Sequence, residues 1–262
     1  MRTAMASLPQ PPDPRPPRVP TVTTASVVGP GRLGTVLSRA LGDLGIDVSG
    51  PTGHGEPIAA ADAVLLCVPD AEIAAAAASA RSDAGPGALI GHTSGATPLD
   101  DVDFGLHPLQ TFVGTETADV FHGIGFGVAG RTPAALATAT ELAERLGGRA
   151  VVIADEDRAA YHAAASIASN YSVTLLAAAE QVAATAGFSA AEARELLAPL
   201  VRRTIDNWVA DGPHRALTGP VARGDVATVE RQRAAVAAVS PDLLPLYDAL
   251  TAATADLAKG TA

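Results

Sequence analysis

Short apolar runs, many of them rich in β-branched residues, alternate with alanine-rich stretches along residues 22–153. Apolar runs of about four to eight residues are typical of buried strands, and the longer stretches between them have the length of helices. The predicted strands are Thr23–Val28, Ile46–Ser49, Ala63–Val68, Ala88–His92, Phe104–His107, Gly123–Ala129 and Ala150–Ile153. The predicted helices are Arg32–Leu44, Asp70–Ala80 and Pro133–Leu146. This alternation predicts a parallel sheet with helices on its faces.

The strand pattern stops after residue 153, and only helical patterns follow. A long helix is expected from Asp155 to Gly187, because glycine commonly ends a helix. Four further features predict the rest: a capping box at Ser189 and Glu192, a kink at Pro199 with an end near Gly212, a helix from Asp225 to about Val239, and a last helix capped by Ser240. The sequence therefore predicts an α/β domain over 21–153 and a smaller all-α domain over 154–262.

Composition narrows the functional classes. Hydrophobic residues make up 48% of the chain and aromatic residues only 3%, which indicates a folded protein that packs through small side chains. The net charge of −10 argues against a nucleic-acid partner, because phosphate contacts need clustered lysine and arginine. The single cysteine, Cys67, favours a reducing compartment. Residues 1–20 are proline-rich and are expected to be a disordered tail, and no run of apolar residues is long enough to span a membrane. We therefore expect a cytoplasmic protein with no membrane partner.

The most informative motif is Gly29-Pro30-Gly31-Arg32-Leu33-Gly34, which follows the first predicted strand and opens the first predicted helix. In this context a G-x-G-x-x-G turn binds the diphosphate of a dinucleotide at the helix N-terminus. The alternative is a glycine-rich turn without a ligand. All six residues of this turn are candidate cofactor contacts, and the fold that the motif implies is a Rossmann-type domain.

The end of the second predicted strand bears on which dinucleotide is bound. Residues Ser49–His54 contain no aspartate or glutamate to hold the ribose hydroxyls, so the sequence favours NADP over NAD. Ligands of such sheets bind beyond the carboxyl ends of the strands, where Val68, Pro69 and Ser94 are further cofactor candidates. His107 follows the fifth strand and is a candidate substrate contact.

Polar residues on the long helix are the candidate catalytic groups. At 100° per residue, His162, Ser166 and Asn170 fall on one stripe of a helix that is otherwise apolar enough to be buried. Buried polar groups need partners, either a substrate or internal hydrogen bonds to the sheet domain. Further along, Arg223 could bind a substrate carboxylate, and Asp225 either orients Arg223 or caps the next helix.

Six motifs carry a resemblance to a known group of proteins: GPGRLG at 29–34, LLCVPD at 65–70, HTSG at 92–95, HPLQTF at 107–112, YHAAASIASNY at 161–171 and LTGPVARGD at 217–225. Across residues 22–258 the chain resembles Rossmann-like proteins with a helical C-terminal domain of unknown function. This group is related to ketopantoate reductases, pyrroline-5-carboxylate reductases and other NADP-dependent oxidoreductases. The resemblance implies NADPH at the glycine turn, a substrate cleft between the domains, and a homodimer formed through the helical part.

The leading hypothesis is an NADPH-dependent reductase of a small 2-oxo acid or related carbonyl, similar to ketopantoate reductase. Ketopantoate reductases use a lysine on a helix as proton donor, but the only lysine here is Lys259 in the C-terminal tail. His162 is the substitute, with His107 in reserve, and Asn170, Ser166 or Ser94 would bind the carbonyl oxygen. The alternatives are a cyclic-imine reductase and a non-catalytic NADP-binding sensor or scaffold. No spacing of histidine or cysteine predicts a metal site.

Overall fold

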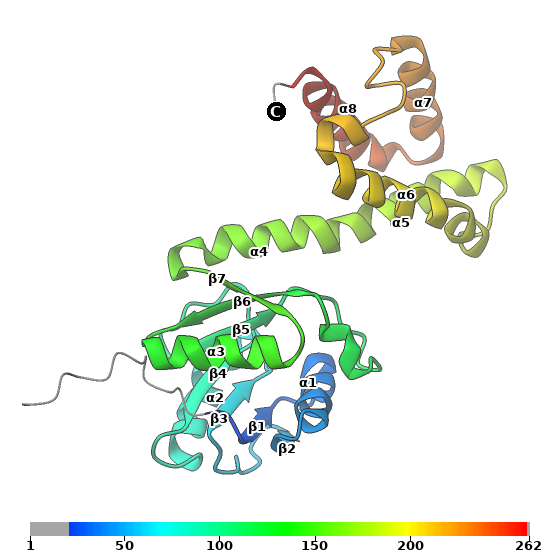
Figure 1. The fold of residues 1–262 in the computed structure, drawn as a ribbon. Helices are drawn as coiled ribbons and strands as arrows, with labels where there is room; N and C mark the ends of the chain where they lie inside the picture. The colour runs from blue at the N-terminus through cyan, green and yellow to red at the C-terminus, as the bar shows by residue number, and fades with distance from the viewer. Residues whose placement is uncertain (1–20, 261–262) are drawn as a thin grey trace, which may run out of the picture. The chain divides into compact units, whose positions relative to one another are not determined.

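The structure is a computed structural model that describes residues 21–260 in two compact units, divided between Ser166 and Ile167 (Figure 1). The expected tail, residues 1–20, lies outside the described residues. The sequence places the domain boundary at residue 153, whereas the structure divides the chain inside the long helical segment. The first helical turns after the sheet therefore belong to the first unit.

Within residues 21–260, seven strands form one sheet in the order β2-β1-β3-β4-β5-β6-β7. Their bounds are β1 Thr24–Val28, β2 Asp47–Thr52, β3 Ala63–Leu66, β4 Leu89–His92, β5 Phe104–Pro108, β6 Gly125–Gly130 and β7 Arg149–Val152. The first five run parallel, which confirms the predicted α/β class. The expectation of an entirely parallel sheet is wrong for the last two strands, because β6 pairs antiparallel with β5 and β7 pairs parallel with β6. The connection between β5 and β6 contains only a short 3-10 segment, and antiparallel neighbours need no crossover helix.

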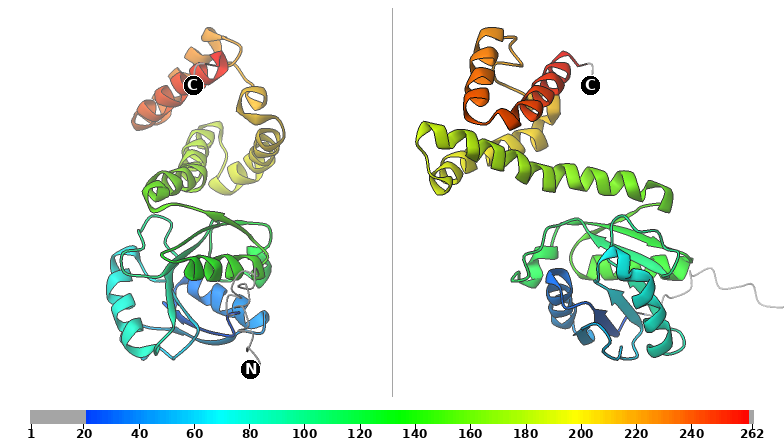
Figure 2. Two further views of the ribbon diagram at one scale, coloured as in Figure 1. Left: turned by 60° about the vertical axis from the view of Figure 1, so that its left-hand side comes forward. Right: turned by 180° about the vertical axis from the view of Figure 1, so that it is seen from behind.

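Three helices cover the two faces of the sheet (Figure 2). They are α1 Arg32–Asp43, α2 Ile73–Asp83 and α3 Pro133–Arg145. Helices α1 and α3 bury leucine, valine and alanine side chains against one face, together with Phe104, Phe121 and Phe126. Helix α2 packs through Ile73 and its alanines against the other face. The many alanines allow these layers to approach closely, as the composition suggests.

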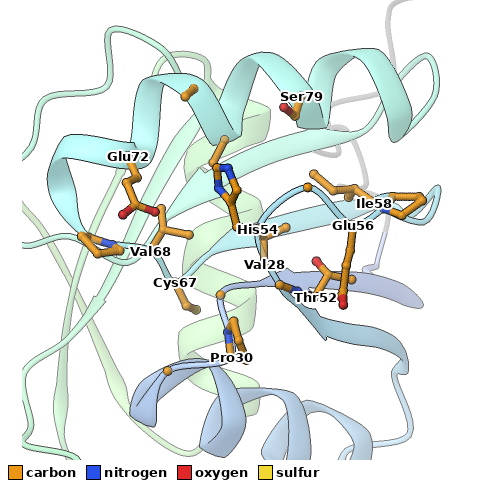
Figure 3. Close-up of a pocket in the computed structure, with 18 of the residues that line it drawn as sticks. Val28, Pro30, Thr52, His54, Glu56, Ile58, Cys67, Val68, Glu72 and Ser79 are labelled. Atoms are coloured by element: carbon orange, nitrogen blue, oxygen red, sulfur yellow. Dashed lines mark hydrogen bonds between the residues drawn. The ribbon is translucent and has the colours of Figure 1, made fainter.

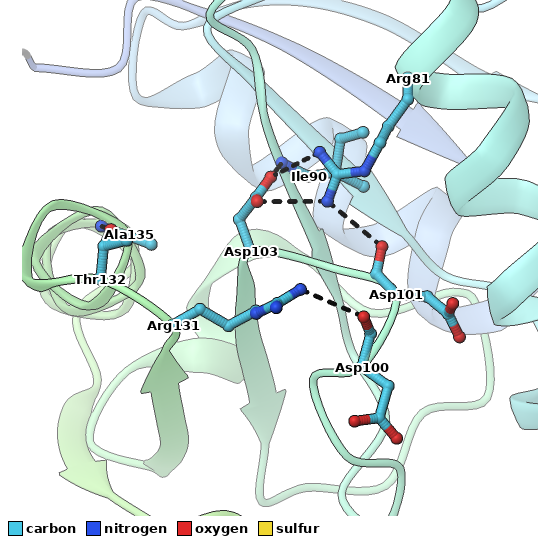
Figure 4. A network of polar contacts seen from close by, with 8 residues as sticks. All are labelled: Arg81, Ile90, Asp100, Asp101, Asp103, Arg131, Thr132 and Ala135. Atoms are coloured by element: carbon cyan, nitrogen blue, oxygen red, sulfur yellow. Dashed lines mark hydrogen bonds and ion pairs between the residues drawn. The ribbon is translucent and has the colours of Figure 1, made fainter.

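Two aspartates fasten the amino ends of the strands. The Asp62 carboxylate accepts hydrogen bonds from the backbone N–H groups of Thr23 and Thr24, both at 2.9 Å, and these bonds lower the pKa of Asp62 to about 2. The Asp103 carboxylate accepts from Arg81 on α2 and from the backbone N–H of Ile90, at 3.2 and 2.9 Å (Figure 4). Both aspartates therefore lie at the edge of the sheet opposite to the carboxyl ends of the strands.

The remaining helices follow the predicted order, with bounds α4 Arg158–Ser166, α5 Ser172–Ala183, α6 Ala190–Ala216, α7 Val226–Val239 and α8 Leu244–Lys259. Gly187 ends the first stretch in the left-handed conformation, and Ser189 and Glu192 form the capping box. The non-helical dihedral angles inside α6 occur at Gly212, where the sequence places the end of this helix, and the expected kink at Pro199 stays a prediction. Glycine reaches the positive φ found at that break without strain.

The long helix differs from the expectation between Ile167 and Tyr171, where its hydrogen bonds are of the π type. A π segment closes i→i+5 bonds, so the regular rotation of 100° per residue does not continue through it. The positions that a regular rotation predicts beyond Ser166 therefore do not carry over, and the place of Asn170 on the same face as His162 stays a prediction. The expected burial of the helix is also wrong beyond Ser166, because α5 contains no buried residue.

Among residues 21–260, no single helix has both the length and the apolar character to cross a membrane, although one sharply bent pair, Asp155–Ala186 with Ala190–Ala216, meets those criteria jointly. The same part of the chain contains no cluster of three or more histidine, cysteine, aspartate or glutamate side chains suited to a metal ion.

Candidate functional site

The glycine turn joins β1 to α1. Two of its glycines are required by close backbone contacts, and the third lies in open space. Gly29 has a φ of +104°, and a Cβ there would lie 2.4 Å from the carbonyl oxygen of Cys67. A Cβ on Gly34 would lie 2.0 Å from the carbonyl oxygen of Gly29. The protein's own backbone therefore requires glycine at both positions. A Cβ on Gly31, in contrast, would meet nothing within 4 Å.

The open space at Gly31 lies at the N-terminus of α1. Gly31 is the N-cap of this helix, and no side chain caps it. The first N–H groups of a helix need a partner and carry partial positive charge, which makes an uncapped N-terminus suited to an anion. The turn thus combines free donors with room for a ligand, as the sequence motif predicts.

A cavity of about 990 Å³ opens beside this turn, wholly inside the first unit (Figure 3). It is lined by the glycine turn, by the loop that follows β2, by residues 67–69 after β3, and by the outer side of α2. This volume lies at the upper end of the range for small-molecule sites. The cavity lies at the carboxyl ends of β1, β2 and β3, where ligands bind in open α/β sheets.

The structure brings together five of the nine predicted cofactor residues in the cavity wall, namely Gly29, Pro30, Gly31, Val68 and Pro69. Leu33 packs on the sheet core, and the Arg32 stem lies against Gly114 of the β5–β6 connection. The Ser94 hydroxyl is engaged in its own turn, where it accepts hydrogen bonds from the N–H groups of Ala96 and Thr97. Arg32, Leu33, Gly34 and Ser94 are thus outside the cavity lining.

The cavity also contains an acid that the sequence reasoning missed. Strand β2 ends at Thr52 instead of Ser49, so the loop at the cavity begins at Gly53 and includes Glu56. The Glu56 Oε2 atom accepts a hydrogen bond of 2.7 Å from the backbone N–H of Gly53. The predicted strand ends at Ser49, because a Gly-Pro pair such as Gly50-Pro51 normally argues against a strand interior. An acid was therefore sought only up to His54, and Glu56 was missed.

A second group of polar side chains forms where α4 packs on β5 and β6. Glycines make room for the helix, because a Cβ on Gly105 would lie 2.6 Å from Arg158 Nη2 and one on Gly127 would lie 2.8 Å from the Tyr161 hydroxyl. His107, near the carboxyl end of β5, lies 2.9 Å from the Tyr161 hydroxyl through its Nδ1 atom. Tyr161 was not among the predicted site residues, although it precedes His162 in the chain.

His162 completes this polar cluster of His107, Arg158, Tyr161 and His162. Its ring centroid lies 5.9 Å from that of His107, and a Cβ on Gly95 would lie 2.7 Å from its Nδ1 atom. The Nδ1 atom is buried and has no hydrogen-bond partner among residues 21–260. Because buried polar atoms are normally satisfied, this nitrogen is available to a ligand or a water molecule.

Burial and positive charge set the protonation of the cluster. Burial, followed by the neighbouring His162 and Arg158, lowers the pKa of His107 to about 4. Arg158 is 2% exposed, and its Nε donates a 2.7 Å hydrogen bond to Asp155 Oδ1. Burial raises the pKa of Tyr161, against the effect of the Gly127 N–H group. At this pKa His107 is neutral at pH 7, which argues against its expected role as the reserve proton donor.

The other predicted site residues are placed on their own elements. Ser166 is the last residue of α4 and is half-buried, whereas Asn170 lies in the π segment and is exposed. Asp225 caps α7 by accepting a hydrogen bond from the Thr228 N–H, which is the structural alternative that the sequence left open. Arg223 is exposed in the preceding loop. Substrate contacts of Asn170, Ser166, Arg223 and Asp225 stay predictions.

A mostly parallel sheet with an open glycine turn at its carboxyl edge defines the Rossmann class of dinucleotide-binding folds. The chain is similar to two solved structures over nearly its whole length. Protein TM1727 from Thermotoga maritima gives a TM-score of 0.72 at 24% identity, covering 90% of this chain and 98% of that one. Protein BF3122 from Bacteroides fragilis gives 0.71 at 22% identity, covering 89% and 98%.

More distant similarity extends to the pyrroline carboxylate reductase of Plasmodium falciparum, whose structure contains bound NADP. Its TM-score is 0.57 at 9% identity, covering 90% of this chain and 98% of that one. No curated protein matches the chain. The family model described as a domain of unknown function, DUF2520, matches residues 124–254, which is half of the chain. The chain therefore belongs to the DUF2520 family, as the resemblance in the sequence predicted.

Proposed function

We propose that the protein is an NADPH-dependent reductase of a small carbonyl compound, with 2-oxo acids as the first substrate class and ketopantoate as the first candidate. The observation that carries this proposal is the uncapped N-terminus of α1, which faces the open space at Gly31 beside the cavity. A diphosphate is the ligand that such a turn binds best, because its oxygens accept hydrogen bonds from several backbone N–H groups at once.

The residues present fit a dinucleotide. The amides of the glycine turn would bind the diphosphate, the cavity between Thr52 and α2 would take the adenosine, and Val68 and Pro69 would flank the other half. A reduced nicotinamide supplies a hydride when bound. The choice of NADPH is supported by the fold shared with the pyrroline carboxylate reductase, which was solved with NADP, and with a reductive aminase solved with NADPH.

The polar cluster provides the proton that carbonyl reduction requires. His162 is the proposed donor, because its buried Nδ1 atom is without a partner among the described residues and lies beside the turn that follows β4. Neutral His107 and the Tyr161 hydroxyl hydrogen-bond each other and fix the wall against which His162 lies. An ordered donor of this kind contributes about 100-fold or more to the rate.

The proposal is tested with the wild-type protein. We expect NADPH to bind in calorimetry and to be oxidised, as followed by its absorbance, when pyruvate, ketopantoate or a cyclic imine carboxylate is added. Turnover of the imine and of no ketone would replace the carbonyl substrate with an imine. Tight NADPH binding without turnover of any compound would indicate a binding protein instead of an enzyme. Failure to bind NADPH would contradict the proposal as a whole.

We further propose that the protein forms a homodimer through its second unit. Large apolar side chains are exposed along α6, including Leu200 at 63% and Val209 at 71%. A groove of about 410 Å³ between α5 and α6 is lined mainly by valine, leucine and alanine. Exposed apolar surface of this extent is unusual in a monomer and is typical of an interface between subunits. The family resemblance supports a second copy of the chain as the partner.

Replacing Leu200 with aspartate is expected to dissociate this dimer, because the side chain is exposed in one chain and would bury a charge in the interface. Sedimentation velocity should show a dimer for the wild-type protein and a folded monomer for Leu200→Asp. Leu109→Asp, at an exposed leucine of the first unit, is the matched control and should stay dimeric. A monomeric wild-type protein, or a Leu200→Asp variant that stays dimeric, would contradict this interface.

A further inference from the structure

The loop after β2 lies directly beside the glycine turn. The carbonyl oxygen of Thr52, the last residue of β2, accepts a 2.9 Å hydrogen bond from the N–H of Gly29. Residues 53–56 therefore begin at the diphosphate end of the cavity and form its wall. In a Rossmann fold the side chains at this place meet the ribose that carries either a 2′-hydroxyl or a 2′-phosphate.

Glu56 is the charged side chain at this end of the wall. Its Oε2 atom accepts the Gly53 N–H at 2.7 Å, and its carboxyl carbon lies 3.5 Å from the place of a Cβ on Gly53. Figure 3 shows the side chain next to Thr52, on the loop that also carries His54. The carboxylate thus accepts a hydrogen bond from Gly53, the first backbone N–H beyond β2, so this N–H group is not free for another anion.

The other ionisable side chains of the cavity offer little compensation for a phosphate. Glu72 and Asp83 are acids, and the lining residues, all within the described chain, include no lysine or arginine. His54 is the only basic side chain that lines the cavity in this part of the structure. A 2′-phosphate would therefore meet a negative surface, and Glu56 is the acid that lies closest in the chain to the end of β2.

We propose that Glu56 determines how strongly the site discriminates between NADPH and NADH. This inference rests on the proposed dinucleotide site. The carboxylate competes with the 2′-phosphate for the Gly53 N–H and repels its charge, whereas it accepts hydrogen bonds from the two ribose hydroxyls of NADH. The wild-type site therefore binds NADPH less tightly, relative to NADH, than the same cavity would without this one charge.

The test compares the dissociation constants of NADPH and NADH for the wild-type protein and for Glu56→Gln, by fluorescence titration at low and at high salt. Glutamine keeps an oxygen for the Gly53 N–H but removes the charge. We expect the affinity for NADPH relative to NADH to rise about tenfold in Glu56→Gln, because a phosphate carries nearly two charges and lies close to the carboxylate. The difference in this affinity ratio between the wild-type protein and Glu56→Gln should become smaller at high salt, since Glu56 is exposed and its charge is screened.

Asp47→Asn is the matched control, because it removes the same charge from the opposite end of β2. Its ratio of affinities should stay within about twofold of the wild-type ratio, as expected for a screened distant charge. An unchanged ratio in Glu56→Gln, or an equal change in Asp47→Asn, would overturn the role of Glu56 while the dinucleotide site stands. A wild-type protein that binds neither dinucleotide would overturn the inference together with the proposed function.

Discussion

Replacing Gly31 with aspartate is expected to lower the affinity for NADPH by about 100-fold or more while the fold stays intact. Gly31 has extended dihedral angles that any residue adopts, and a Cβ there meets nothing within 4 Å. Aspartate is a favoured N-cap residue, so its carboxylate would accept the free N–H groups of α1 and stabilise the helix by about 0.5 kcal/mol. The same carboxylate would occupy the place of the diphosphate and repel it.

The measurement pairs NADPH titration with thermal unfolding, because Gly31→Asp is expected to lower the affinity for NADPH and to raise the stability of the fold. Gly42→Asp is the matched control, since Gly42 lies near the other end of α1 and also has open space around its Cβ position. This control should bind NADPH as the wild-type protein does. If Gly31→Asp binds NADPH normally, the ligand does not lie at this helix, and the reductase proposal loses its basis.

The order and type of elements in the first unit could be predicted because each depends on local pattern. Short, mainly apolar runs predicted β1, β3 and β4, and the glycine turn predicted both the end of β1 and the start of α1. The direction of β6 could not be predicted in this way. Phe126 and Val128 alternate with glycine in either direction. The register of the pairs, from Phe104 with Gly130 to Pro108 with Phe126, shows that the strand runs antiparallel to β5.

The glycine turn and its cavity could be predicted from the sequence more fully than the polar cluster, for a physical reason. The proposed diphosphate contacts would come from backbone amides in one continuous motif, Gly29–Gly34, so six adjacent residues carry the sequence signal. The polar cluster instead joins residues 54 positions apart, such as His107 and Tyr161. It depends on Gly105 and Gly127 leaving room for α4, which is a fact about packing that no local pattern contains.

Two further differences arise where local rules were overridden. A Gly-Pro pair ended the predicted second strand at Ser49, but β2 continues to Thr52 because it pairs with β1 up to Val28. Edge strands tolerate proline, since one of their sides needs no hydrogen bonds. In the long helix, a regular rotation was assumed throughout, and the π segment at Ile167–Tyr171 could not be recognised from residues that are ordinary helix formers.

The second large effect is expected from His162→Gln, which should lower kcat for carbonyl reduction by about 100-fold or more and leave the dissociation constant of NADPH unchanged. His162 lies in the polar cluster and not in the lining of the dinucleotide cavity. Glutamine keeps much of the volume and one donor but cannot transfer a proton at neutral pH. His107 cannot replace it, because its pKa of about 4 leaves no imidazolium at pH 7.

Tyr161→Phe separates positioning from proton donation. Phenylalanine keeps the ring between α4 and β6 but removes the hydroxyl that lies 2.9 Å from His107 Nδ1, so we expect a loss in kcat of about tenfold and a shifted pH profile. His122→Gln, at an exposed histidine of the first unit, is the control and should leave kcat unchanged. Wild-type turnover in His162→Gln would exclude His162 as the donor. A loss in Tyr161→Phe that exceeds the loss in His162→Gln would instead assign the proton to the Tyr161 hydroxyl, whose raised pKa keeps it protonated at neutral pH.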